Sequence, residues 1–161
     1  MNKNWVQTWG QAHSAFSFFY YPSCPKTYRL VIKSAISGSS LRFEISNECA
    51  KNKVEIGSLT VALCDEKGNF TGDCKQVTVG GEKSPCLEIG QVATTDPVDI
   101  NIEAGEYFCI SAYVSKGALR SGNLINNADI ITVRGDVTSD PRIENQRRIR
   151  DKVREVASVV L

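Results

Sequence analysis

Hydrophobic and polar residues alternate along much of the chain between residues 27 and 133. Residues 28–33 read Tyr-Arg-Leu-Val-Ile-Lys, and residues 41–46 read Leu-Arg-Phe-Glu-Ile-Ser, so alternate positions share one character. A period of two with one polar face is typical of antiparallel strands that bury only one side. Similar composition predicts further strands over residues 59–63, 76–79, 98–102, 107–114 and 130–133.

The connectors between these segments are rich in turn-forming residues. They include Ser-Gly-Ser-Ser at 37–40, Lys-Gly-Asn at 67–69, Gly-Gly at 80–81 and Glu-Ala-Gly-Glu at 103–106. Glycine adopts positive φ without strain, while Asn, Asp and Ser hydrogen-bond to nearby backbone. Seven or more short strands at this spacing, with no helical pattern between them, predict an all-β antiparallel sandwich or barrel.

The sequence predicts a distinct N-terminal arm over residues 1–26. Seven of the thirteen aromatic residues of the chain fall within its first 21 positions. Aromatic side chains bury the largest area per residue, so this arm is expected to pack across the sandwich and seal one mouth or edge. The alternative is an aromatic platform that stacks on a sugar ring or grips a partner domain.

The C-terminal segment, residues 140–161, follows the sandwich predicted over residues 27–139. Asp140 and Pro141 suit the start of a helix, and Ile149, Val153 and Val156 then recur at helical spacing. The competing prediction is a strand over residues 156–161, because β-branched residues dominate there. This segment is therefore expected to be a short helix, a strand, or a linker toward a further domain.

Composition and charge exclude several classes of function. The 161 residues suffice for one hydrophobic core, and a net charge of +1 provides no field for nucleic acid or an anionic membrane. No run approaches the roughly 18 apolar residues of a membrane span. The sequence as written predicts a cytoplasmic protein, although a chain trimmed of its signal peptide would look the same and secretion stays open.

Six cysteines occur without a Cys-x-x-Cys motif, so neither a metal site nor a cofactor is expected. Cys64 and Cys109 stand within apolar runs, where cysteine usually acts as a small buried hydrophobic residue. We therefore expect reduced thiols. If the chain is oxidised instead, Cys64 and Cys74 form the favoured disulfide.

The sequence also offers little for catalysis. An activated serine needs a base within hydrogen-bond reach, and the one histidine, His13, precedes the strand-rich region. Residues 135–138 read Gly-Asp-Val-Thr, with valine where a Gly-Asp-Ser nucleophile block would need serine, and they are expected to form a turn. The chain alone is predicted to have no catalytic residues.

Six short blocks nevertheless occur in an order that resembles the β-sandwich preceding the catalytic domain of many bacterial GDSL-type (SGNH) esterases, lipases and acylhydrolases. The blocks are Thr8-Trp9, Tyr28 to Ile32, Leu41 to Asn47, Ile56 to Ala62, Val77 to Gly81 and Thr95 to Val98. The resemblance covers roughly residues 8–114 and implies a jelly-roll-like sandwich. It also implies a GDSL-type catalytic domain as partner, within the same parent hydrolase.

The resemblance places Trp9 and the turn at Ser46 and Asn47 near the face that meets the catalytic domain. An Asn side chain both donates and accepts hydrogen bonds, which suits an interface. The alternative is that Ser46 and Asn47 only close a local turn.

The favoured hypothesis is a non-catalytic accessory domain that helps shape the substrate cleft of an ester hydrolase. The alternative is a free-standing carbohydrate-binding module, in which case a carbohydrate or ester substrate is the ligand. An enzyme with its own chemistry is the third class, and no paired acids, metal cluster or phosphate loop supports it.

Overall fold

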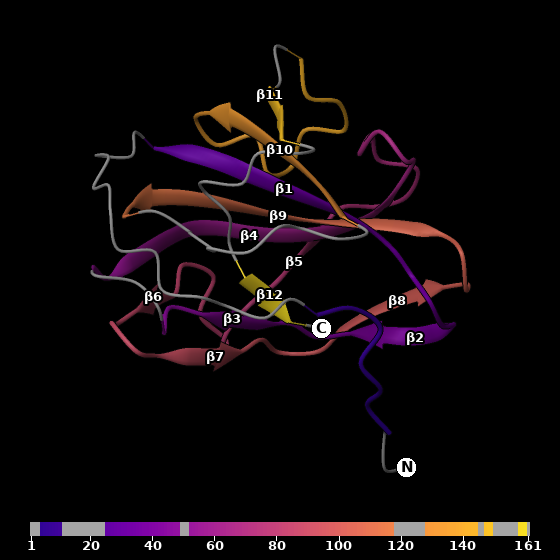
Figure 1. The fold of residues 1–161 in the computed structure, drawn as a ribbon, viewed down its shortest axis with the longest axis horizontal. Helices are drawn as coiled ribbons and strands as arrows, with labels where there is room; N and C mark the ends of the chain where they lie inside the picture. The colour runs from indigo at the N-terminus through magenta and orange to yellow at the C-terminus, as the bar shows by residue number, and fades with distance from the viewer. Residues whose placement is uncertain are drawn as a thin grey trace.

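The computed structural model describes residues 4–10, 25–48, 52–117, 128–144, 147–149 and 158–160, with backbone alone for 128–129 and the last two segments. In this described part the chain is all-β and contains no helix (Figure 1). It accordingly has no helix long and apolar enough to cross a membrane. The all-β prediction is confirmed.

The larger layer is a seven-stranded antiparallel sheet. Its main path runs β11-β10-β1-β9-β4-β5, and β6 pairs with the other end of β4. Its strands are β1 (Lys26–Lys33), β4 (Val54–Cys64), β5 (Lys75–Gln76), β6 (Cys86–Leu87), β9 (Tyr107–Lys116), β10 (Ala128–Arg134) and β11 (Arg147–Ile149).

Two small antiparallel sheets form the second layer, which lies below the large sheet in Figure 1. One sheet pairs β2 (Gly38–Leu41) with β8 (Val98–Ile102). The other has the order β12-β3-β7, with β12 (Ser158–Val160), β3 (Glu44–Ser46) and β7 (Val92–Thr94). The two layers make a sandwich-like arrangement.

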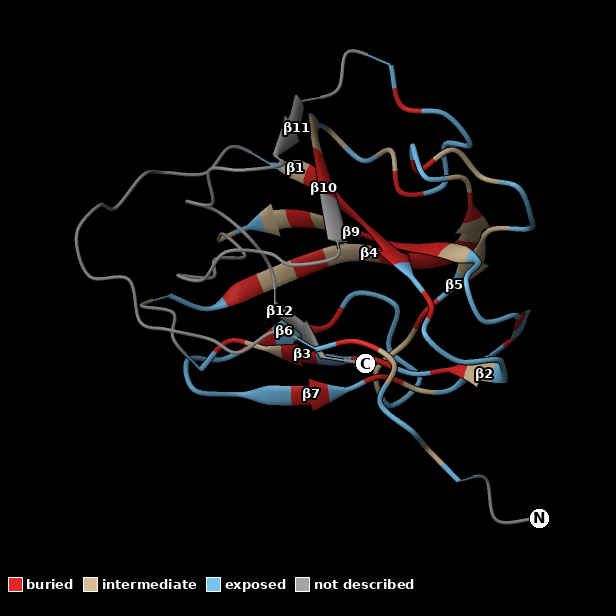
Figure 2. Cartoon of the chain, turned by 45° about the vertical axis from the view of Figure 1, so that its right-hand side comes forward, coloured by how far each residue is buried: buried red, intermediate tan, exposed pale blue. Residues whose placement is uncertain are grey.

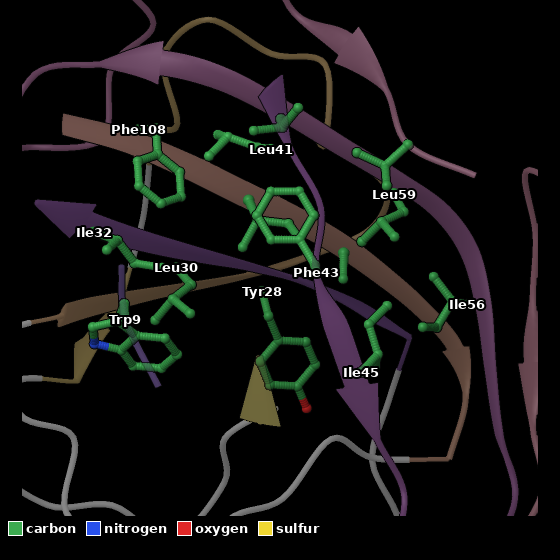
Figure 3. Close-up of a cluster of buried hydrophobic side chains, with 14 of the residues drawn as sticks. Trp9, Tyr28, Leu30, Ile32, Leu41, Phe43, Ile45, Ile56, Leu59 and Phe108 are labelled. Atoms are coloured by element: carbon green, nitrogen blue, oxygen red, sulfur yellow. The ribbon is translucent and has the colours of Figure 1, made fainter. Parts of the chain in front are cut away.

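The main hydrophobic core lies between these layers (Figure 3). The alternation of apolar and polar residues over residues 41–45 contributes side chains to this core as predicted. Leu41, Phe43 and Ile45 are buried, while the intervening Arg42 and Glu44 are exposed. The same cluster includes Tyr28, Leu30, Ile32, Ile56, Leu59, Val61, Phe108 and Ile110.

The outer face of the large sheet carries a second core, which corrects the prediction that β1 has a polar face. Six of the eight residues of β1 are buried, including Arg29 and Val31 (Figure 2). Loop residues 65–74 and 135–144 cover this face, and Ile143 and Phe70 contribute to the second cluster. Alternation predicts which side of a strand a residue occupies, but not whether distant loops cover that side.

The strand predicted over residues 41–46 is two strands, and residues 38–41, expected to be partly a turn, form β2. The break lies at Arg42 and Phe43. Phe43 N donates to the Thr95 hydroxyl at 2.9 Å, and Thr95 N donates to Phe43 O at 2.8 Å. The chain opposite this break runs from β7 to β8 through Pro97, which has no N–H to donate to a neighbouring strand. Continuous backbone pairing therefore stops here, and β2 and β3 are separate strands.

The structure favours strand over helix in the C-terminal segment. β11 pairs with β10, and β12 pairs with β3 through Val160 and Glu44. Residues 140–144 are not helical, and Pro141 O accepts a hydrogen bond from Phe70 N. The helix predicted from Asp140 is wrong for the described residues, and the strand predicted near the end is present at residues 158–160.

Candidate functional site

A pocket of about 250 Å³ lies between the N-terminal segment, residues 4–10, and the chain that links β2 to β3. We call it the arm pocket. Its lining combines an indole ring, a cation, a carboxylate, two hydroxyl groups and an amide with apolar residues. The lining residues are Trp5, Val6, Gln7, Thr8, Ser40, Leu41, Arg42, Phe43 and Glu44.

Two residues of the N-terminal segment, Thr8 and Trp9, anchor it to the rest of the fold. Trp9 is 8% exposed and belongs to the main core, where Figure 3 shows its ring beside Leu30 and Ile32. The Thr8 hydroxyl accepts a hydrogen bond from Ala35 N at 3.0 Å and lies 3.2 Å from the Ser34 hydroxyl. Burial of an aromatic ring thus fixes the segment in place, and the sealing role of the whole arm stays a prediction.

Two charged side chains of the arm pocket project from the same strand face. Arg42 and Glu44 flank the buried Phe43, and both are exposed. The Arg42 guanidinium carbon lies 4.4 Å from the centre of the Trp5 ring, a cation–π arrangement. Among the described residues, no hydrogen-bond partner is present for the side chain of either Arg42 or Glu44. Their side-chain donors and acceptors are therefore available to a ligand.

The structure does not gather the three site residues predicted from the sequence into one site. Trp9 is in the core, Ser46 is half-buried, Asn47 is 4% exposed, and none of them lines the arm pocket. The Ser46 hydroxyl donates to the Glu48 carboxylate at 2.9 Å and accepts from Glu48 N at 3.2 Å. Ser46 thus stabilises a local turn, and its role at an interface stays a prediction.

Asn47 is the polar support of the turn between β6 and β7. Its side-chain nitrogen donates to the carbonyl oxygens of Asn52, Leu87 and Glu88 at 3.0 to 3.1 Å. Its backbone N donates to Gln91 O at 2.8 Å. This geometry is that of a buried structural amide, and contact with a partner domain stays a prediction.

The glycine pair at residues 80–81 is connected to Asp96. Gly80 and Gly81 have φ angles of 58° and 85°, which the turn requires and which glycine adopts without strain. The Asp96 carboxylate accepts hydrogen bonds from the Thr78 hydroxyl at 2.6 Å and from Gly81 N at 2.7 Å. These two bonds hold the pKa of Asp96 below its usual value. Two blocks of the family resemblance therefore meet in space.

Arg29 is the most unusual residue that sequence reasoning missed. It is 0% exposed, and its Nε donates to the Ser111 hydroxyl at 2.8 Å. Its other nitrogens donate to the carbonyl oxygens of Gly68, Val137, Thr138 and Asp140. The Phe70 ring centre lies 4.3 Å from the guanidinium carbon. Burial lowers the pKa of Arg29, while these contacts compensate the buried charge.

Three cysteines lie close enough to this guanidinium to interact with its charge. Cys64 and Cys109 are buried as predicted, and Cys74 is half-buried. A hydrogen bond between the Cys64 and Cys109 thiols, together with burial, raises the pKa of Cys64. Neither these three residues nor Cys86 forms a disulfide in the described part. The Cys64 thiol is therefore protonated and structural, whereas the hydrogen bond with Cys64 lowers the pKa of Cys109.

The described residues show no catalytic or metal-binding cluster. No group of three or more His, Cys, Asp or Glu residues among them could hold a metal ion. His13, Cys24, Cys49 and most of the aromatic arm lie outside the described residues. The turn expected at Gly135 is present, with a φ angle of 85°.

No protein-family model matches the chain, and no curated protein sequence matches it significantly.

Proposed function

We propose that this chain is a non-catalytic accessory domain that docks on the catalytic domain of a GDSL-type ester hydrolase. The support has two parts: the resemblance of the six sequence blocks, and the way the residues of those blocks connect to each other in the fold. Within the described residues nothing resembles an activated nucleophile.

The observation that carries the proposal is that the resemblance blocks form one connected framework. Phe43 of the third block bonds to Thr95 of the last, and Thr78, in the Val-x-x-Gly-Gly block, bonds to Asp96. Trp9 of the first block packs in the same core as Ile56 of the fourth. Residues that support each other in this way specify a scaffold rather than a reaction centre. A scaffold of this kind suits a domain that acts by docking.

The first test is an activity assay on the purified chain. Hydrolysis of short p-nitrophenyl esters should stay at the background rate, because no described residue supplies a base for a serine. A rate well above background that disappears in His13→Ala would contradict the proposal. His13 is the appropriate variant because it is the one histidine of the chain.

The second test measures docking directly. A GDSL-type catalytic domain, expressed without its own N-terminal sandwich, is titrated with this chain, and binding is followed by calorimetry. We expect saturable one-to-one binding, and an unrelated β-sandwich of similar size serves as the control. If neither this chain nor the control binds catalytic domains drawn from several GDSL-type enzymes, the accessory-domain proposal fails.

A further inference from the structure

We propose that the arm pocket binds one neutral sugar ring, which contacts Trp5, Arg42 and Glu44. This goes beyond docking, because it assigns a ligand to a surface of the chain itself. It can therefore be correct or wrong independently of the proposed hydrolase partner.

The size of the pocket restricts the ligand. Its volume of about 250 Å³ is below the roughly 300–1,000 Å³ of pockets that hold drug-sized molecules. A single ring with its substituents fits this space, whereas a folded peptide segment or a long acyl chain does not. The pocket is open to solvent at residues such as Val6, Arg42 and Glu44, which are all exposed. A ring at the end of a longer glycan can therefore enter.

The chemistry of the lining selects a neutral ligand rich in hydroxyl groups. Arg42 offers several N–H donors, and Glu44 offers two acceptor oxygens. Vicinal hydroxyl groups both donate and accept, so one ring can satisfy both side chains. The positive and negative charges balance, and an anion such as phosphate would meet the Glu44 carboxylate. An alkyl chain would leave both charged groups without partners.

The aromatic component of the pocket is held in place before any ligand binds. Trp5 stacks on Arg42 at 4.4 Å, and the segment that carries it is fixed by Thr8 and by the buried Trp9. Gln7 donates from its side-chain nitrogen to Trp9 O at 3.4 Å. Such pre-organisation reduces the entropy lost on binding. The arm pocket is thus a built concavity rather than a gap beside a loose terminus.

The position of the pocket relates it to the rest of the chain. Glu44 of β3 pairs with Val160 of β12, and Figure 1 shows these two strands side by side. Because Glu44 also lines the pocket, the pocket lies near the strand contributed by the C-terminal segment. If the chain docks on a hydrolase as proposed above, a sugar held here would be a part of the substrate remote from the ester bond.

The test is calorimetric or ligand-observed NMR titration of the intact chain with methyl glycosides of glucose, galactose, xylose and N-acetylglucosamine. A ligand of this size bound at ordinary efficiency has a Kd on the order of 1 mM. We expect at least one glycoside to saturate in that range. Inorganic phosphate and hexanoate, tested in parallel, should not bind.

Variants locate the binding. Trp5→Ala and Glu44→Gln should each weaken the preferred glycoside about tenfold, because the first removes the aromatic contact and the second replaces a charged acceptor with a weaker neutral one. The matched control is Glu88→Gln, an exposed acid beyond β6, which should leave binding unchanged. Circular dichroism and the melting temperature establish that the variants are folded.

Three results would overturn the assignment. They are the absence of saturation by any glycoside up to about 50 mM, well above the Kd expected for so small a ligand; equal affinities in Glu44→Gln and Glu88→Gln; and binding of phosphate or hexanoate in preference to sugars. Docking on a hydrolase domain is measured separately with the same variants. If the wild-type chain docks but binds no sugar, only the sugar site is refuted; if the variants lose sugar binding and still dock, the sugar site is supported independently of docking.

Discussion

Replacing Arg29 with methionine should destabilise the sandwich by about 3 kcal/mol. Methionine resembles the aliphatic part of arginine in bulk, so the substitution removes the guanidinium without leaving a large cavity in the second core. The effect then reports on the hydrogen bonds and the charge of Arg29. No other arginine whose side chain the structure describes is fully buried.

The magnitude follows from which acceptors lose their partner. Gly68 O and the Ser111 hydroxyl bond to Arg29 in buried surroundings. Each orphaned acceptor there costs roughly 1–3 kcal/mol. Thr138 O keeps its bond from the Thr60 hydroxyl at 2.8 Å, and the Val137 and Asp140 carbonyls are only partly buried. Removing a desolvated charge offsets some of the loss, which leaves a net effect of about 3 kcal/mol.

Urea unfolding followed by circular dichroism measures this difference. In thermal unfolding, the melting temperature of a chain of this length falls by roughly 2–4 °C for each kcal/mol of unfolding free energy that is lost, so the expected fall is about 6–12 °C. Arg142→Met is the matched control, because Arg142 is exposed in the same covering loop, and it should stay within about 0.5 kcal/mol of wild type.

The reasoning is refuted if Arg29→Met is as stable as the Arg142→Met control or more stable than wild type. That result would mean that desolvation of the charge outweighs its hydrogen bonds, as happens when some buried ion pairs are replaced by hydrophobic residues. If the methionine variant cannot be recovered folded, Arg29→Lys provides the measurement. It keeps the charge but loses the planar set of donors, so it should also be destabilised.

Four further outcomes are expected. Asn47→Ala should lower the free energy of unfolding by about 1–3 kcal/mol in urea, since Leu87 O loses a buried donor; an unchanged value would show that the amide is dispensable. The melting-temperature gap between wild type and Asp96→Asn should shrink from about pH 6 to about pH 3. The hydrogen bonds of the ionised Asp96 carboxylate stabilise the fold fully above the ordinary Asp pKa of roughly 3.9, and this stabilisation is lost as the pH falls through the lowered pKa of the folded state. A melting-temperature gap that does not depend on pH would argue against these carboxylate bonds. Gly117→Ala should cost roughly 1–3 kcal/mol, because a Cβ would lie 2.6 Å from Lys53 O at a φ of 90°; wild-type stability would contradict this geometry. Alkylation of the native protein should label Cys86 before the buried thiols, and denaturation without reductant should release six sites, whereas four or fewer would indicate disulfides.

The sequence predicts the inner core well and the outer core poorly. Alternation identifies Leu30, Phe43 and Ile45 as inward-facing because a strand's own period determines its faces. Burial of Arg29 depends on the segments around Gly68 and Val137, which lie 39 and 108 residues away along the chain. No local pattern contains that information. An arginine in a half-polar strand has the same sequence signature whether water or a loop covers it.

Pairing partners likewise determine where the strands end. The alternation through Arg42 is uninterrupted, so the sequence pattern predicts a single strand. The break between β2 and β3 arises where Thr95 and Pro97 face the strand from more than 50 residues away along the chain.

The arm pocket shows the same limit for the site. The sequence indicates that Arg42 and Glu44 share a face, and it marks the N-terminal segment as aromatic. Which aromatic residue reaches that face depends on the path of the segment, which burial of Trp9 fixes. The family resemblance points to Trp9, whereas Trp5 lines the pocket.

The connected framework separates buried residues that hold the fold together from exposed residues that can contact a partner. Bonds such as Phe43 to Thr95 and Thr78 to Asp96 hold the sandwich together, so any chain with this fold has a physical reason to keep those residue types at that spacing. Exposed residues such as Arg42 and Glu44 contribute little to stability and are free to differ with function. Docking and sugar titrations on these exposed positions, rather than further matching of the buried blocks, discriminate an accessory domain from a free-standing binding module.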